Sequence, residues 1–131
     1  MPTLAPPEPP TAWTVLSLRP AGQHAGLRDA AARAGSRLLA LSPQRIAPRD
    51  DAATRRALAV ALAADIIVFT SPNAVRSAAQ LQRLRLRRGQ AVLAVGDGTR
   101  RALARLGVDA QAPARMDSEG LLALPALRQV R

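Results

Sequence analysis

Apolar residues in this chain fall into short runs that alternate with longer segments of helical spacing. The clearest run is Ile66-Ile67-Val68-Phe69, whose length and β-branched content predict a strand buried on both faces. Ser71 then suits an N-cap and Pro72 suits the first helical position, and an alanine-rich segment predicts a helix from residue 73 to about 84. A buried strand that leads directly into a capped helix is half of a βαβ unit.

The same alternation extends along most of the chain. Further strands are predicted at 13–18, 37–41, 90–95 and 108–110, and further helices at 25–34, 51–64, 99–106 and from 118 onwards. Gly35 and Gly107 stand where a helix C-terminus favours glycine. Strands that alternate with helices in this way predict an α/β fold built from parallel-sheet βα units.

Composition narrows the class of protein and site. The chain has 131 residues, which is one domain or a piece of a larger protein, and it has no cysteine and a single histidine, His24. Disulfides, thiolate metal sites and histidine clusters are therefore excluded. No apolar run approaches the roughly 20 residues of a membrane span, and the proline-rich start lacks the pattern of a signal peptide. We expect a cytoplasmic protein with a disordered leader at 1–12.

The net charge of +10 comes entirely from arginine, because none of the 19 basic residues is lysine. One interpretation is the codon bias of a GC-rich genome, which favours arginine and alanine. The other is a polyanionic partner, either a nucleic acid or a small molecule with several carboxylates or phosphates. No aromatic residue interrupts the arginine-rich segment 83–88, which disfavours stacking on a single strand.

Three predicted strand-to-helix junctions, at 19–22, 70–74 and 95–99, carry small polar residues. In a parallel sheet such junctions gather at one edge, where helix N-termini can bind an anion. The alternative is that each junction is only a capped helix start, with a glycine where the turn needs a positive φ. Gly96-Asp97-Gly98 is predicted as a tight turn, and it lacks the third glycine of a dinucleotide fingerprint.

Taken in order, four motifs from Trp13 onwards resemble the uroporphyrinogen-III synthase family. They are Leu18-Arg19-Pro20-Ala21-Gly22-Gln23, Phe69-Thr70-Ser71-Pro72-Asn73-Ala74-Val75-Arg76, Ala94-Val95-Gly96-Asp97-Gly98-Thr99 and Asp117-Ser118-Glu119-Gly120-Leu121-Leu122. The resemblance implies two α/β domains joined by a two-stranded connector, with the active site in the cleft between them. It also implies a lyase of haem and sirohaem biosynthesis, a monomer that uses neither metal nor cofactor. That enzyme cyclises hydroxymethylbilane to uroporphyrinogen III and inverts the last pyrrole ring.

The resemblance also implies roles for particular residues. Ser71, Pro72, Asn73 and Ala74 would bind substrate carboxylates at one helix start, and Gly96 and Thr99 at a second. Thr99 would lie near the leaving hydroxyl as a proton donor, with a simple N-cap as its alternative. Ser118 and Glu119 would cap a third helix, and Arg19 would lie at the mouth of the other domain.

Family members are longer than this chain. By resemblance, residues 13–42 would open the first domain, 43–48 would form the connector, and 49–131 would form an incomplete second domain. We therefore expect the chain by itself to be inactive, to bind tetrapyrrole weakly and to self-associate. A basic nucleic-acid-binding module and a non-catalytic interaction module remain the alternatives.

Overall fold

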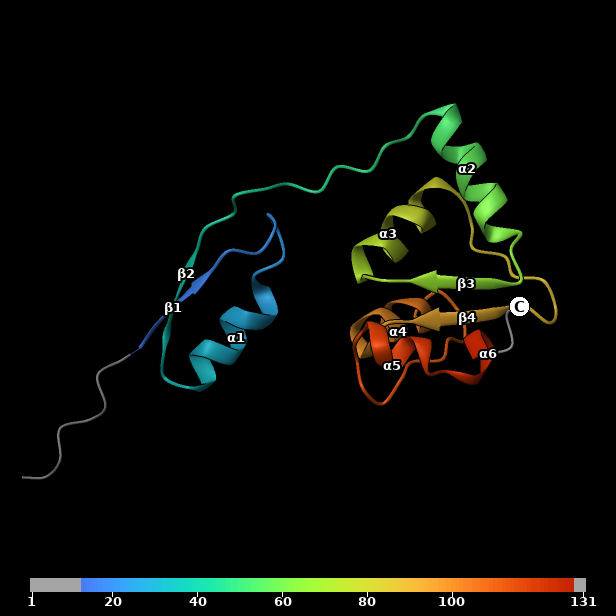
Figure 1. Ribbon diagram of the computed structural model, residues 1–131. Helices are drawn as coiled ribbons and strands as arrows, with labels where there is room; N and C mark the ends of the chain where they lie inside the picture. Colours follow the sequence, from blue (N-terminus) through green and yellow to red (C-terminus); the bar gives the residue numbers. More distant parts are fainter. Residues whose placement is uncertain (1–12, 129–131) are drawn as a thin grey trace, which may run out of the picture. The chain divides into compact units, whose positions relative to one another are not determined.

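The computed structural model describes residues 13–128. It divides the chain into two units, Met1–Ala47 and Pro48–Arg131, and Figure 1 shows both. The leader predicted at 1–12 lies outside the described residues.

The first unit is a single strand–helix–strand motif. It consists of β1 (Thr14–Ser17), α1 (Ala25–Arg33) and β2 (Arg37–Ala40), and β1 pairs parallel with β2 from Thr14↔Arg37 to Ser17↔Ala40. Gly35 has a φ of +67°, a left-handed conformation that ends α1 as predicted. Both strands are slightly shorter than the predicted ranges.

The second unit repeats this motif and adds further helices. Its elements are α2 (Ala52–Leu62), β3 (Ile66–Phe69), α3 (Pro72–Leu81), β4 (Ala91–Ala94), α4 (Asp97–Ala104), α5 (Ser118–Leu122) and α6 (Pro125–Arg128). β3 pairs parallel with β4 from Ile66↔Ala91 to Phe69↔Ala94. α3 contacts β3 and α4, and α4 also contacts β4 (Figure 1). The predicted α/β class with parallel strands is confirmed.

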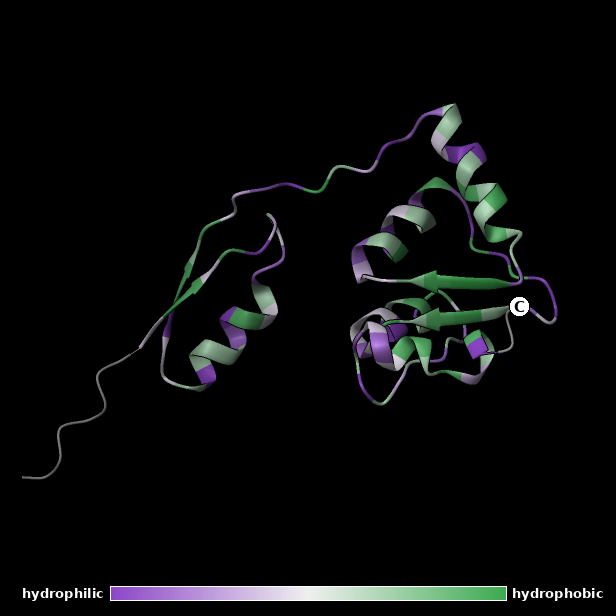
Figure 2. Cartoon of the chain, in the orientation of Figure 1, coloured by the Kyte–Doolittle hydropathy of each residue, from purple (hydrophilic) through white to green (hydrophobic). Residues whose placement is uncertain are grey.

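A single hydrophobic cluster holds the second unit together. Val75 of α3 and Leu103 of α4 are its largest fully buried side chains, and Leu93 of β4 is fully buried outside this cluster. Figure 2 shows β3 and β4 as apolar along their length, while the helices alternate between apolar and polar positions. The hydrophobic effect therefore acts mainly between the two strands and the helix pair α3 and α4.

The prediction of a strand at 108–110 is wrong. In its place, Gln111 alone forms a parallel bridge with Leu93. The N–H of Gln111 donates to the carbonyl of Val92 at 2.9 Å, and the N–H of Ala94 donates to the carbonyl of Gln111 at 2.8 Å. The ladder cannot extend further because Pro113, two residues on, has no N–H to donate.

Two local predictions also need correction. β3 is not buried on both faces, because Ile67 and Phe69 are buried while Val68 between them is 39% exposed. Its apolar run therefore reflects the preference of β-branched residues for strands as much as burial. The helix predicted to reach residue 84 ends at Leu81, because Gln82 is extended with φ −161° and ψ 158°.

Candidate functional site

The start of α3 has the predicted cap. Ser71 is the N-cap and Pro72 the first helical residue, and the N–H of Ala74 donates to Ser71 Oγ at 3.1 Å. The N–H of Val75 donates to the carbonyl of Ser71 at 3.3 Å. The helix start thus satisfies most of its own donors, because Pro72 has none. The Ser71 hydroxyl proton is a group that this helix start can offer an anion.

Asn73 is also connected to the helix that it begins. Its side-chain oxygen accepts a hydrogen bond from the guanidinium of Arg76. Asn73 is half-buried, whereas Arg76 is exposed.

The start of α4 is arranged differently. Gly96 is its N-cap, with φ −166° and no side chain to cap the helix. The N–H groups of Thr99 and Arg100 donate to the Gly96 carbonyl at 3.1 and 3.0 Å. Among residues 13–128 the N–H groups of Asp97 and Gly98 have no partner. Two donors therefore point out of this helix end, the arrangement that favours an anion.

The tight turn predicted at Gly96-Asp97-Gly98 is wrong, since Asp97 and Gly98 form the first turn of α4. Neither Gly96 nor Gly98 has a positive φ, whereas Gly22 at the first junction has φ +81°. The conformational interpretation of junction glycines therefore holds for Gly22. At Gly96 and Gly98 neither a positive φ nor a clash requires glycine, because a Cβ at either position would make ordinary van der Waals contacts.

Thr99 is the third residue of α4, so its interpretation as an N-cap is wrong. Its side chain is 3% exposed, and its hydroxyl has no hydrogen-bond partner among residues 13–128. Every completely buried side-chain oxygen in that part of the chain does have a partner. The small accessible part of Thr99 therefore includes the hydroxyl.

The third helix start has an unpredicted cap. Asp117 is the N-cap of α5, and its Oδ1 accepts a hydrogen bond from the N–H of Gly120 at 2.7 Å. Ser118 and Glu119, expected to cap, are instead the first two helical residues, and both are exposed. Arg115 pairs with the Glu119 carboxylate at 2.7 Å and also with that of Asp117.

Close packing accounts for the glycine of the Ser-Glu-Gly motif. A Cβ on Gly120 would lie 1.9 Å from the carbonyl oxygen of Arg115. Because this oxygen belongs to the backbone, no side-chain movement could relieve the clash. This backbone approach holds the segment before α5 against its first turn.

Close approaches at Gly96 and Gly98 show that the three helix starts lie near one another. A Cβ on Gly98 would lie 3.7 Å from Pro72 Cγ, so the starts of α3 and α4 are adjacent. A Cβ on Gly96 would lie 3.5 Å from the Cβ of Met116, which directly precedes the α5 cap. Met116 is 59% exposed and was not predicted, because no motif distinguishes it. The junctions at 70–74 and 95–99 therefore share one edge, as expected of a parallel pair.

Arg19 and its junction belong to the first unit. Arg19 is exposed, and the N–H of Ala21 beside it donates to the carbonyl of Gln44 at 3.0 Å. Eight of the nine predicted site residues therefore belong to the second unit, whereas Arg19 belongs to the first.

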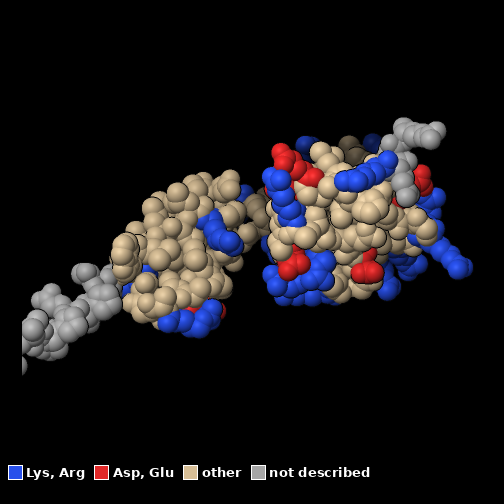
Figure 3. Space-filling model, turned by 60° about the horizontal axis from the view of Figure 1, so that its bottom comes forward, with Lys and Arg blue, Asp and Glu red and all other residues tan. Residues whose placement is uncertain are grey.

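Asp97 is a further residue that the predictions missed. Its carboxylate lies at the first turn of α4 and pairs with Arg100 at 3.1 Å. A carboxylate at a helix N-terminus is stabilised by the helix dipole, and here it stands where an anionic ligand would also bind. On the face seen in Figure 3, basic side chains are likewise spread over the second unit with acidic ones between them.

In the first unit, His24 connects three segments. Its Nδ1 is hydrogen-bonded to Ser17 Oγ at 2.9 Å, and its Nε2 to Ser42 Oγ at 2.7 Å. His24 and Ser17 are both buried. The bonds join the end of β1, the start of α1 and the residues after β2. A lone histidine gave no sequence signal for this role.

One comparison with known families identifies the chain. It matches the family model described as uroporphyrinogen-III synthase HemD over residues 26–130, which is most of its length. The chain belongs to the uroporphyrinogen-III synthase family. No curated protein matches it.

The matched region extends from α1 to α6, so it contains the three helix starts and every predicted site residue except Arg19. Within residues 13–128 of this family member, no cluster of three or more histidine or acidic side chains is placed to hold a metal. No helix in the same range is long and apolar enough to cross a membrane.

Proposed function

We propose that this chain carries the substrate-binding second domain of a uroporphyrinogen-III synthase, in which the second unit binds the carboxylates of hydroxymethylbilane at the starts of α3, α4 and α5. The observation that carries the proposal is the close approach of Pro72 to Gly98, where a Cβ would lie 3.7 Å from Pro72 Cγ, so that two helix starts lie side by side within the family match. A tetrapyrrole with several carboxylates can engage adjacent helix starts at the same time.

Different residues contribute different groups to the proposed binding site. Ser71 and Asn73 supply side-chain donors at α3, while Pro72 and Ala74 shape its start. Gly96 leaves room above α4, where the N–H groups of Asp97 and Gly98 are open. Ser118 supplies a hydroxyl at α5, and Glu119 keeps Arg115 close to that helix at 2.7 Å.

The chemistry needs orientation more than a strong nucleophile. The C–O bond of the hydroxymethyl group breaks, the hydroxyl leaves as water, and a pyrrole nitrogen donates its electron pair to form a cationic azafulvene. The carbon of the last ring that already carries the chain attacks this centre and forms a spiro intermediate. The bond from that carbon to its original bridge then breaks and leaves a second azafulvene cation. The bridge bonds to the other α-carbon of the ring, and loss of the proton there restores the pyrrole with the ring inverted. Thr99 would donate a hydrogen bond to the departing oxygen, and a folded, desolvated substrate favours ring closure over attack by water.

The domain assignment is part of the same proposal. Residues 13–42 would open the first domain of a two-domain synthase, with Arg19 available to a substrate carboxylate. Residues 43–48 would form the connector, and 49–131 would belong to the second domain. Neither a metal nor a cofactor is required, and the setting would be the cytoplasm.

The test is a thermal shift under anaerobic conditions with uroporphyrinogen III, whose carboxylates match those of the substrate. We expect the ligand to raise the melting temperature of the second unit. Ser71→Asp and Thr99→Asp should each abolish that shift, because a carboxylate at either helix start repels the ligand and occupies its donors. Binding is a better readout than turnover here, because it depends on the second unit alone.

Ala53→Asp is the matched control, since it adds the same charge at the exposed start of α2. It should leave the ligand shift unchanged. A shift that persists in both site variants would remove the starts of α3 and α4 from the binding site. A shift lost equally in Ala53→Asp would mean that overall charge, not the site, controls binding.

A further inference from the structure

A groove lies between α3 and α4 in the second unit, lined by residues outside the candidate site. It consists of two adjoining cavities of about 320 and 280 Å³. Ala79 and Leu106 line both cavities, so the two lie next to each other. The other lining residues are Val75, Arg76, Gln80, Ala102 and Arg105 in the first cavity and Arg83 and Leu84 in the second.

The floor of the groove is apolar and shallow. Val75 is fully buried, Leu106 is 47% exposed, and two alanines, Ala79 and Ala102, lie in the walls. Small side chains allow the backbone of an incoming segment to approach closely. On α3, Arg76, Ala79 and Gln80 follow one another at spacings that place them on one face of the helix.

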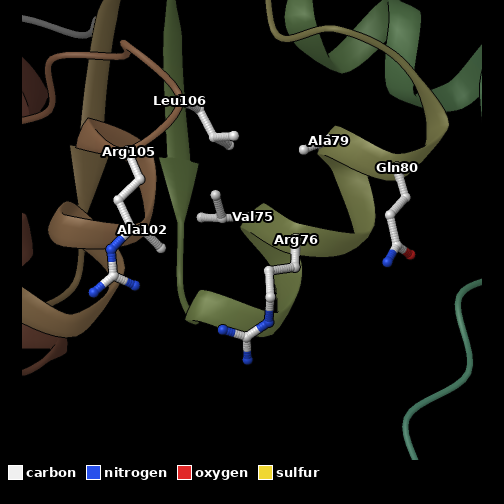
Figure 4. Close-up of a pocket in the computed structure, with 7 residues that line it drawn as sticks. All are labelled: Val75, Arg76, Ala79, Gln80, Ala102, Arg105 and Leu106. Carbon is white, nitrogen blue, oxygen red and sulfur yellow. The ribbon is translucent and has the colours of Figure 1, made fainter.

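Arginines line the rim of this floor. Figure 4 shows the side chains of Arg76 and Arg105 extending from neighbouring helices toward the same side, with Gln80 further along α3. Arg83 lines the second cavity. Guanidinium groups therefore occur along the length of the groove rather than at one point.

These arginines lack acidic partners in the folded chain. None of the lining residues is acidic. Within the described range 13–128, neither Arg76, Arg83 nor Arg105 forms an ion pair, whereas Arg100 on α4, the helix that Arg105 follows, is paired with Asp97 at 3.1 Å. The groove thus presents apolar surface together with uncompensated positive charge.

We propose that the groove docks an acidic amphipathic helix of another protein. Apolar anchors of such a helix would fill the floor, and acidic side chains on its flanks would meet the three guanidinium groups. Charges spread along the groove favour a partner with several separated carboxylates over a ligand with one head group. α3 has ten residues and is about 15 Å long, which matches about three turns of a partner helix laid beside it.

The experiment measures fluorescence anisotropy of a labelled helical peptide of about 15 residues, with leucine on one face and glutamate on both flanks. We expect saturable binding that weakens as salt is added. Replacing glutamate with glutamine in the peptide should weaken binding at least about tenfold. The double variant Arg83→Glu/Arg105→Glu should do the same, because it opposes like charges across the interface.

The matched control is Arg56→Glu/Arg128→Glu, which makes the same change in net charge at two exposed arginines outside the groove. It should bind the peptide as the unaltered chain does. Equal losses in the two double variants would show general charge attraction and overturn the proposal. Competition by duplex DNA that is abolished only by the groove variant would assign the surface to nucleic acid instead.

The groove proposal is independent of the synthase proposal. Arg83→Glu/Arg105→Glu should keep the uroporphyrinogen III shift, and Ser71→Asp should keep peptide binding. Loss of peptide binding in Ser71→Asp would place the peptide at the helix starts and refute the groove.

Discussion

The two units share one motif, a parallel strand–helix–strand, but they bury it to different extents. In the second unit, two stacked helices and the strands enclose a cluster in which Val75 and Leu103 are fully buried. In the described part of the first unit, Ala31 is the one buried apolar residue. The same backbone pairing thus has a hydrophobic core in one unit and almost none in the other.

The first unit depends on polar contacts instead. Leu16 and Leu39 lie opposite each other in the β1–β2 register and are more than half exposed, at 54% and 58%. What is buried near them is the hydrogen-bonded pair His24 and Ser17. Because a net hydrogen bond contributes about 1 kcal/mol and a buried leucine more, we expect the first unit to be the less stable one.

The largest effect should come from Leu103→Ala. Leu103 has no exposed surface and lies in the core cluster of the second unit. Removing its side chain leaves a cavity and should lower the free energy of unfolding by about 2–5 kcal/mol. Chemical denaturation followed by circular dichroism measures the change.

Leu39→Ala is the control for that variant. The same truncation at an exposed leucine of the first unit should change the unfolding free energy by less than about 0.5 kcal/mol. Equal costs at the two positions would show that the exposed leucines are covered in solution and that the contrast between the units is wrong.

A smaller and more local effect is expected of His24→Ala. The change leaves the Ser17 hydroxyl, only 2% exposed, without its partner and should cost about 1–3 kcal/mol within the first unit. Hydrogen exchange should quicken at β1 and β2 and stay unchanged at β3 and β4. Faster exchange throughout the second unit would show that the two units unfold together.

The smallest effect concerns the caps of the first helix of each unit. α1 has no side-chain cap, whereas Asp51 caps α2 by accepting a hydrogen bond from the N–H of Thr54 at 2.7 Å. That bond lowers the pKa of Asp51 from its usual 3.8. Its stabilisation is therefore complete above pH 3.8 and is lost as the pH falls through the lower folded value.

Asp51→Asn measures this effect, because asparagine also caps a helix but does not titrate. The melting temperature of the unaltered chain should fall more steeply than that of Asp51→Asn as the pH drops below 3.8. Parallel curves would show that the Asp51 cap does not contribute to acid sensitivity.

Local signals predicted much of the fold. The run Ile66–Phe69 and the pair Ser71 and Pro72 specify the strand and the helix start through backbone preferences alone, and the structure has both. Residues 108–110 failed as a strand, because pairing there depends on what lies beside β4 and on Pro113. The exposure of Val68 could not be predicted from the apolar run Ile66–Phe69, since burial depends on which elements cover each face of β3.

The candidate site was predicted by motif, and its details were missed for a physical reason. Asp117, not Ser118 or Glu119, caps α5, because several neighbouring residues can cap and packing selects among them. The close approaches of Gly98 to Pro72 and of Gly96 to Met116 involve residues far apart in sequence. His24 has its partners 7 and 18 residues away, too distant for a local pattern to connect them.

The register of the two parallel pairs has a consequence for kinetics. Thr14 pairs with Arg37 and Ile66 with Ala91, so each unit closes a crossover loop of nearly the same length. Loop-closure entropy rises only with the logarithm of length, so both units face a similar entropic barrier to forming their strand pair. What differs is the set of core contacts that forms once each loop is closed. Such late contacts slow unfolding more than they speed folding, so the two units should differ chiefly in how long each stays folded.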